Sequence, residues 1–328
     1  MAIILFSGSK LARYGDAIAE KTGLGRVWIG LVLLAAITTM PELVTGVSSA
    51  VLVGLPDLAL GTLLGSCIFN LTILALLDII HRPAPILSHA SLRHIASASI
   101  GILLIAITAG SILAGERFSG LDLGWVGISS IIIIIVYLVG ARLMFRFERK
   151  HQSPSPQAAP SQYEGIPTRT VYLNFALAAV AIIGAGIWLS FIGDEIAATT
   201  GWDATFVGSL FLAITTSLPE LVVTIAALRL GAIDMAVADI LGANMLDMVV
   251  ITWIDLFYTR GAILARVSRI HLITAMVALV MSLLVIVGLR FRQRRKTFIV
   301  ISWYGVALIG LYIFGAYALF ASGTGFVG

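Results

Sequence analysis

The sequence predicts an all-α, polytopic membrane protein of about ten transmembrane helices, arranged as two inverted repeats of five helices. Three observations carry this prediction: the composition, the number of long apolar runs, and a match between the two halves of the chain. Of the 328 residues, 59% are hydrophobic and 12% are charged, whereas ordinary soluble domains carry about 25% charged residues. Runs such as 100–114 and 270–287 contain almost no charge, and ~20 apolar residues suffice to cross a ~30 Å hydrocarbon core.

Ten apolar runs are long enough to count as spans. In chain order, the expected spans are residues 1–20, 26–52, 57–80, 94–114, 121–145, 170–198, 203–230, 233–257, 268–290 and 297–320. The segment between the fifth and sixth spans is rich in Pro, Ser and charge, which is typical of a flexible linker. We therefore expect a first five-helix unit at 1–145, a linker at 146–169 and a second five-helix unit at 170–328.

The two halves repeat each other along much of their length. The matching stretches, at an offset of 178 for the first two pairs and 177 for the third, are residues 14–30 and 192–208, Glu42 and Glu220, and residues 57–71 and 234–248. In this alignment the first span is about eight apolar residues shorter than the sixth. A repeat this long predicts two structurally equivalent halves.

The orientation of the halves follows from the odd number of spans in each. The second unit must enter the membrane in the opposite direction, as in the inverted repeats of secondary transporters. If the first loop is cytoplasmic, 17 of the 21 Lys and Arg residues lie inside, and Arg117, Arg260, Arg266 and Arg269 lie outside. This bias follows the positive-inside rule, so we expect a cytoplasmic linker and both termini outside. Because the basic residues lie between spans, we expect membrane lipid around the protein and no nucleic acid or protein partner.

Two apolar spans carry an unusual Pro-Glu pair, in AAITTMPELV (35–44) and AITTSLPELV (213–222). Pro41 has no N–H, so the carbonyl of Ile37 loses its helical partner and the turn is distorted. Thr38, Thr39 and Glu42 then lie within one turn, where their oxygens can converge on one side.

The second half repeats this arrangement with Thr216, Ser217 and Glu220. Carboxylate, hydroxyl and freed carbonyl oxygens suit hard cations such as Ca²⁺ or Na⁺. An inverted repeat brings two such broken helices together near the membrane midplane, where discontinuous helices bind ions.

The third and eighth spans contribute GSCIFN (65–70) and GANMLD (242–247). Gly65 and Gly242 allow another helix to approach closely, and Asn70 and Asp247 add an amide and a carboxylate at equivalent positions. A simpler interpretation is that each Pro only kinks its helix and each Glu pairs with a buried Arg. The interiors of the second, third and eighth spans hold no Arg or Lys, so a cation is the favoured partner of the two glutamates.

These motifs resemble the two alpha-repeats of the calcium/cation antiporter superfamily, and within it they are most similar to the sodium/calcium exchangers. The resemblance rests on TTMPEL with GTLLGSCIFN and on TTSLPEL with DILGANMLD, and it extends over nearly the whole chain. It implies that Glu42 and Glu220 coordinate Ca²⁺, with help from the backbone carbonyls of Thr38 and Thr216.

The resemblance also implies a set of sodium ligands. The hydroxyls of Thr39 and Ser217 would bind Na⁺, and the carbonyls of Ala35 and Ala213 with the Ser66 side chain would complete the sodium sites. Asn70 and Asp247 correspond to the family's paired amide or acid positions.

Three departures from the family pattern bear on the counter-ion. Ile37 and Thr215 replace the common Gly before the motif Thr, and Ala243 replaces a Ser, which removes one hydroxyl. Asp239 is an unexpected acid that could be a ligand or a solvated residue at the mouth of the pathway; we expect the second.

The resemblance implies an antiporter that exchanges Ca²⁺ for Na⁺ by alternating access, an integral multi-pass protein of a prokaryotic inner or plasma membrane. The alternative is exchange of Ca²⁺ for H⁺, or of another divalent cation, because oxygen ligands alone do not select among hard cations. No nucleophile with a base and no metal-binding His pair is found, so we expect neither an enzyme nor a bound cofactor. The single Cys67 excludes an intrachain disulfide.

Overall fold

The computed structural model describes residues 2–22, 35–82, 84–115, 117, 122–150, 165–229, 231–293 and 295–323. These residues are helices joined by turns, and the one β-type contact among them is an isolated bridge between Leu123 and Val126. The helices in chain order are α1 (Ala2–Thr22), α3 (Ala35–Thr38), α4 (Met40–Val47), the π-helix η2 (Ser48–Val53), α5 (Pro56–Ile80), α6 (Ile86–His89), α7 (His94–Ala114), α8 (Ile128–Lys150), α9 (Thr168–Thr200), α10 (Ala204–Val207), the π-helix η4 (Gly208–Leu212), α11 (Ala213–Thr216), α12 (Leu218–Arg229), α13 (Ile233–Phe257), α14 (Ile263–Arg266), α15 (His271–Phe291) and α16 (Trp303–Gly323).

The predicted all-helical membrane architecture is confirmed. Among the described residues, eight helical segments are long and apolar enough to cross a membrane, and the bent segment 204–229 makes a ninth. The first expected span, 1–20, corresponds to α1, which carries five charged residues and falls short of that hydropathy. The expected spans 94–114 and 233–257 coincide with α7 and α13. The beginning of the second expected span, the 151–164 part of the linker and residue 121 lie outside the described residues.

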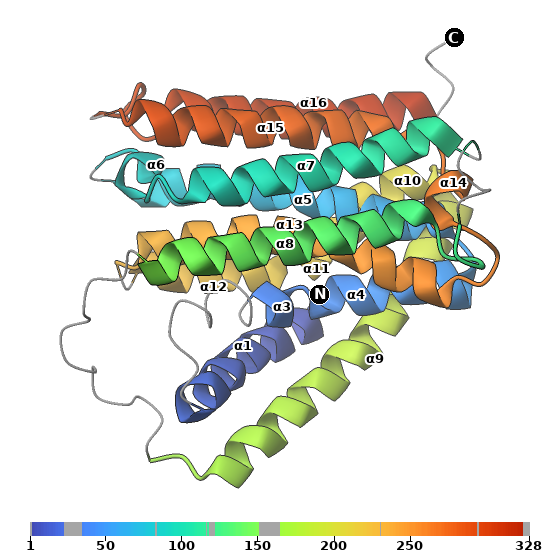
Figure 1. The fold of residues 1–328 in the computed structure, drawn as a ribbon, viewed down its shortest axis with the longest axis horizontal. Coiled ribbons are helices and arrows are strands. Elements are labelled where there is room, and N and C mark those ends of the chain that lie inside the picture. The colour runs from blue at the N-terminus through green and yellow to red at the C-terminus, as the bar shows by residue number, and fades with distance from the viewer. Residues whose placement is uncertain are drawn as a thin grey trace.

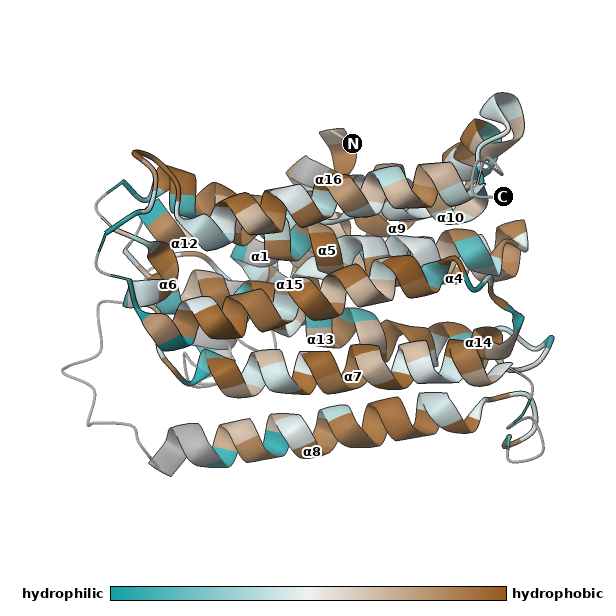
Figure 2. Ribbon diagram, turned by 90° about the horizontal axis from the view of Figure 1, so that it is seen from above, coloured by the Kyte–Doolittle hydropathy of each residue, from teal (hydrophilic) through white to brown (hydrophobic). Residues whose placement is uncertain are grey.

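The helices at the centre of the bundle are mostly buried, and the outer helices are mostly exposed. The spans α5 and α13 are 78% and 72% buried, whereas α8 and α16 are 17% and 22% buried. In Figure 1, α5 and α13 run through the middle of a slab of parallel and antiparallel helices, and α1 and α9 lean away from it together. Figure 2 shows hydrophilic residues gathered at the two ends of the bundle and apolar residues along the helices. This distribution matches a hydrocarbon layer around the middle of the bundle.

Each of the two central helices has an aspartate in its first turn that is hydrogen-bonded by two residues from the other half of the chain. Asp57, in the first turn of α5, accepts hydrogen bonds from the Ser268 N–H (2.6 Å) and lies 3.0 Å from His271 Nε2. At the opposite end, Asp234 in the first turn of α13 accepts from the Ser91 N–H (2.6 Å) and lies 2.9 Å from His94 Nε2.

Each of these residues lies 177 positions from its counterpart, so the inverted repeat places the same crossed contact at both ends of the bundle. Gly54 (φ 83°) and Gly231 (φ 74°) make the tight turns that lead into α5 and α13, a backbone conformation that glycine adopts without strain. The positions of the two central helices therefore depend on both halves.

These crossed pairs differ in burial, which predicts a difference in stability. The His271 side chain is fully buried and Asp57 is 32% exposed, whereas His94 is 9% exposed and Asp234 is 61% exposed. Asp57→Ala leaves a buried imidazole without its partner, so we expect it to lower the free energy of unfolding by about 1–3 kcal/mol. Asp234→Ala should cost less, about 1 kcal/mol or below, because the Asp234 side chain is 61% exposed. Thermal unfolding of the two purified variants measures the order, and equal losses would contradict it.

Candidate functional site

Two helix breaks lie in the buried middle of the bundle, at the residues that precede the Pro-Glu pairs. The second expected span breaks at Thr39, between α3 and α4, and the seventh breaks at Ser217, between α11 and α12. The segments on either side of Ser217 are bent by 42°. Pro41 and Pro219 cannot donate to the carbonyls of the fourth residue before them, which accounts for both interruptions.

All of the predicted site residues are buried around these breaks. Each is at most 3% exposed: Ala35, Thr38, Thr39, Glu42, Ser66, Asn70, Ala213, Thr216, Ser217, Glu220 and Asp247. They come from the two broken spans and from α5 and α13, so both halves contribute.

The Glu42 carboxylate is the point where the two halves meet. Its Oε1 accepts a hydrogen bond from the Ser217 hydroxyl of the other half (2.9 Å) and a longer one from the Ser66 hydroxyl of α5 (3.4 Å). The structure thus brings together a carboxylate and two hydroxyls that lie 24 and 175 positions apart in the sequence.

Glu220 has a different environment from its repeat counterpart. Ala243 stands where Ser66 stands in the first half, and no described side chain donates a hydrogen bond to Glu220 Oε2. Its carboxylate lies within electrostatic range of Glu42, Asp239 and Asp247. The two glutamates therefore differ: Glu42 is held by hydroxyls of both halves, whereas Glu220 Oε2 has no donor among the described side chains.

Several oxygens at the site have no hydrogen-bond partner. Thr39 Oγ1, Glu42 Oε2, Asn70 Oδ1 and Glu220 Oε2 are all buried and unpaired. Leaving such a group unsatisfied costs about 1–3 kcal/mol, so these oxygens favour a ligand that accepts electron pairs. A hard cation fits this set, since hydroxyl, amide and carboxylate oxygens are its usual ligands.

Other predicted ligands are engaged within their own helices. The Ala35 carbonyl accepts from the Thr39 N–H (2.9 Å) and from Thr38 Oγ1 (3.2 Å). The Ala213 carbonyl accepts from the Ser217 N–H (3.0 Å) and Thr216 Oγ1 (3.2 Å). These two carbonyls would have to give up a hydrogen bond before they could bind Na⁺.

Cys67 and Asn244 also belong to the site, although the sequence had not singled them out as site residues. The Asn244 amide donates to the Cys67 carbonyl (3.2 Å), and the Cys67 thiol lies 3.8 Å from the Asn244 carbonyl. The thiol also lies 3.7 Å from Asp247 Oδ2. The repeat offset of 177 relates Cys67 to Asn244, so these residues mark the crossing of α5 and α13 near the two-fold axis.

The structure corrects the expectation for Asp239. We expected a solvated residue at the mouth of the pathway, but Asp239 is 0% exposed. It is one of the buried residues of α13, the helix that also carries Asp247.

No three His, Cys, Asp or Glu side chains of the described residues are placed to hold one metal ion together. A cation at the breaks would therefore be held by one or two carboxylates, and neutral oxygens would supply its other ligands. This mixture suits both a divalent ion and Na⁺, because few of the ligands are fixed charges.

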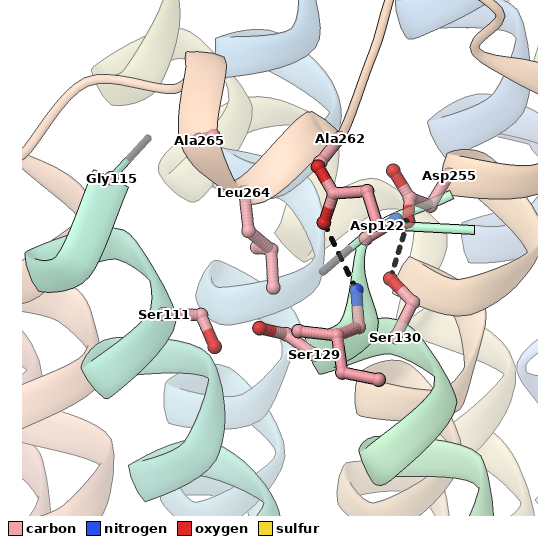
Figure 3. Close-up of a pocket in the computed structure, with 11 residues that line it drawn as sticks. Ser111, Gly115, Asp122, Ser129, Ser130, Asp255, Ala262, Leu264 and Ala265 are labelled. Carbon is pink, nitrogen blue, oxygen red and sulfur yellow. Dashed lines mark hydrogen bonds between the residues drawn. The ribbon is translucent and has the colours of Figure 1, made fainter. Parts of the chain in front are cut away.

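A small cavity at one end of the bundle is separate from this site. Its volume is about 20 Å³, and Ser111, Asp122, Ser130 and Asp255 are among its lining residues (Figure 3). Asp255 accepts hydrogen bonds from Ser130 Oγ (2.7 Å) and from the N–H groups of Gly127 (2.8 Å) and Ile263 (2.7 Å). The repeat counterpart Asp78 accepts from the Ile86 N–H in the same way, so both acids fasten loops to the central helices.

Comparison with known proteins places the chain among membrane exchangers. Residues 1–145 and 170–321 match the family described as sodium/calcium exchanger protein. The chain is 26% identical to the inner membrane protein YrbG of Escherichia coli over 293 residues, which cover 87% of this chain and 86% of that protein. It is 29% identical to the sodium/calcium exchanger MaX1 of Methanosarcina acetivorans over 153 residues, 46% of this chain and 40% of that protein. The sodium-calcium exchanger NCX_Mj, in a structure soaked with Na⁺ and Sr²⁺, has the same fold (TM-score 0.62, 20% identity, 96% and 94% of the two chains).

Proposed function

The chain belongs to the sodium/calcium exchanger protein family, and from this premise we propose that it is an antiporter that exchanges Ca²⁺ for Na⁺ by alternating access. The observation that carries the proposal is the meeting of Glu42, Ser66 and Ser217 between the two halves. Thr39, Asn70 and Glu220 each add a buried oxygen that has no hydrogen-bond partner. The alternative is exchange of Ca²⁺, or of another divalent cation, for H⁺.

The ligand set supports competition between the two ions. Ca²⁺ is coordinated by six to eight oxygens, and the two carboxylates contribute most of its binding free energy. Na⁺ can be coordinated by hydroxyl, amide and carbonyl oxygens with a single negative charge nearby. Because the same carboxylates and hydroxyls would serve both, Ca²⁺ and Na⁺ cannot be held fully at once. Exclusive occupancy of one site is what an exchanger needs, since each ion must leave before the other binds.

Sodium-driven flux of ⁴⁵Ca²⁺ in proteoliposomes tests the proposal. We expect an outward Na⁺ gradient to drive Ca²⁺ uptake against its own gradient, and a pH gradient without Na⁺ to drive none. Flux driven by the pH gradient alone would favour the Ca²⁺/H⁺ alternative. Passive Ca²⁺ flow that no counter-ion accelerates would contradict both forms of exchange.

Thr39→Ala and Ser217→Ala should separate the two ions. Each removes one proposed sodium ligand, so we expect the Na⁺ concentration for half-maximal flux to rise by about fivefold for a loss of about 1 kcal/mol. The half-maximal Ca²⁺ concentration should change less, because both carboxylates remain. Since Ser217 also donates to Glu42, Ser217→Ala should affect Ca²⁺ more than Thr39→Ala does. Unchanged sodium dependence in both variants would rule out these hydroxyls as sodium ligands.

We also propose the orientation that the charge bias predicts, with a cytoplasmic linker at 146–169 between the units 1–145 and 170–328 and both termini outside. The test places a single Cys at Ser155 in a Cys67→Ala background and applies a membrane-impermeant thiol reagent. We expect labelling after permeabilisation and none in intact cells. Labelling of intact cells would show that the linker lies outside and that the proposed orientation is wrong.

A further inference from the structure

Asp239 in α13 has no part in the site proposed above, and its surroundings lack the partner that a buried carboxylate requires. It is 0% exposed, and neither of its carboxylate oxygens has a hydrogen-bond partner. The two ion pairs found among the described residues involve Asp57 and Asp234. Asp239 is therefore a buried acid that no described side chain or backbone group balances.

The repeat indicates that packing does not require this acid. The counterpart of Asp239 in the first half is Thr62, 177 positions earlier, and the Thr62 hydroxyl donates to the Leu58 carbonyl (2.8 Å). Thr62 is also fully buried. The same place in the inverted repeat thus accommodates a neutral, satisfied side chain, so the charge of Asp239 is an addition specific to the second half.

Asp239 lies beyond the acids of the proposed ion site, and together Glu220, Asp247 and Asp239 form what we call the acidic row. Glu220 lies within electrostatic range of both Asp239 and Asp247. Asp239 and Asp247 are eight residues apart on α13, or about 12 Å along the helix axis. The row therefore runs from the helix breaks toward the end of α13 where Asp234 contacts His94. The basic groups at that end are His94 and Arg93, which lie beside Asp234, and Arg229, the last residue of α12.

A carboxylate in this position needs a positive partner from solution. Burial of an unpaired charge in a membrane protein costs several kcal/mol, and Glu220, which lies within electrostatic range, is itself an acid. We propose that Asp239 binds one monovalent cation, H⁺ or Na⁺, in addition to the ions at the helix breaks. A single positive charge balances the single carboxylate, so Glu42 and Glu220 remain available for Ca²⁺. The inference adds a cation to the proposed exchange but does not depend on which ions the central site exchanges.

The test measures cation-dependent stability, which needs no transport. The parent is the full-length Glu42→Gln/Glu220→Gln/Asp247→Asn variant, in which the three central carboxylates no longer bind cations. Its melting temperature is recorded over a series of Na⁺ concentrations at fixed pH, with choline as the replacement, and over a pH series at fixed Na⁺. A ligand that binds only the folded state raises the melting temperature, so we expect a rise with Na⁺ if Asp239 binds Na⁺, or with falling pH if it binds H⁺.

Adding Asp239→Asn should remove that rise, and the variant should be more stable than its parent when the cation is absent. Glu195→Gln, which removes an exposed acid on α9, is the matched control and should leave the rise intact. Asp239→Thr introduces the residue of the first half and serves as a second neutral variant. Equal Na⁺ and pH dependence with and without Asp239 would overturn the proposal. Failure of both neutral variants to fold would also overturn it, because a cation-binding acid should be replaceable by a neutral residue of similar size.

Discussion

Glu42→Gln and Glu220→Gln are each expected to abolish Ca²⁺ transport while the protein remains folded. Each change removes one of the two charges proposed to face a divalent ion in a site of low dielectric constant. Such a loss costs several kcal/mol of binding, which corresponds to a Ca²⁺ affinity at least about a hundredfold weaker. A glutamine at position 42 can still accept hydrogen bonds from Ser217 and Ser66, so the charge is lost but the local contacts are kept.

The measurements are ⁴⁵Ca²⁺ flux in proteoliposomes and the melting temperature of the purified variants. Glu195→Gln, an equal loss of charge on the exposed surface of α9, should transport like the unmodified protein. Because Glu220 faces other acids and has no donor on its Oε2, Glu220→Gln should also relieve repulsion and leave the fold at least as stable. Calcium flux at the unmodified level in either variant would refute the assignment of that glutamate.

The architecture could be predicted from local features of the sequence. The apolar runs predicted α7 and α13 with their boundaries. Pro41 and Pro219 predicted distorted turns, which the structure shows as helix breaks at Thr39 and Ser217. These features depend on the hydrocarbon thickness and on the missing N–H of proline, so they act within one segment. The burial of Glu42 and Glu220 followed in the same way from two acids inside apolar spans.

The contacts between the halves could not be predicted in this way. The repeat offset shows that Cys67 corresponds to Asn244, and Asp57 to Asp234, but not which side chain touches which. His271 binds Asp57 across the two halves only because the chain folds back on itself in the inverted orientation. Asp239 was misjudged for the same reason: an acid near a helix end is exposed or buried according to the helices packed beside it.

The asymmetry of the site also emerged only from the packing. Glu42 receives two hydroxyls, one from each half, whereas Glu220 Oε2 receives none from the described side chains. The second half holds three of the four buried acids around the breaks. An exchanger that binds ions of different charge can use this uneven distribution of acids. The half with more carboxylates attracts cations more strongly, so Ca²⁺ and monovalent cations need not occupy the two halves equally.

Gly65→Ala is expected to abolish transport and to lower stability by more than a typical core substitution. Gly65 on α5 packs directly on η4, and a Cβ there would lie within 2.5 Å of the Ser209 Cα and closer still to the Ser209 carbonyl oxygen. Overpacking of a core usually costs about 1–3 kcal/mol, and here the obstacle is backbone, which cannot rotate away. The helices must separate, and Ser66, the next residue, would be pulled away from Glu42.

Gly110→Ala on α7 is the matched control, because a Cβ at Gly110 meets no atom within 4 Å, and it should keep both transport and stability. The combination of Gly65→Ala with Ser209→Gly separates two explanations of the loss. If the added methyl group clashed with the Ser209 side chain, removing that side chain would restore flux; because the contact is with the Ser209 backbone, we expect no recovery. Transport by Gly65→Ala at the unmodified level would show that α5 and η4 can move apart without disturbing Ser66, and that the close approach of the two helices is not what positions the site.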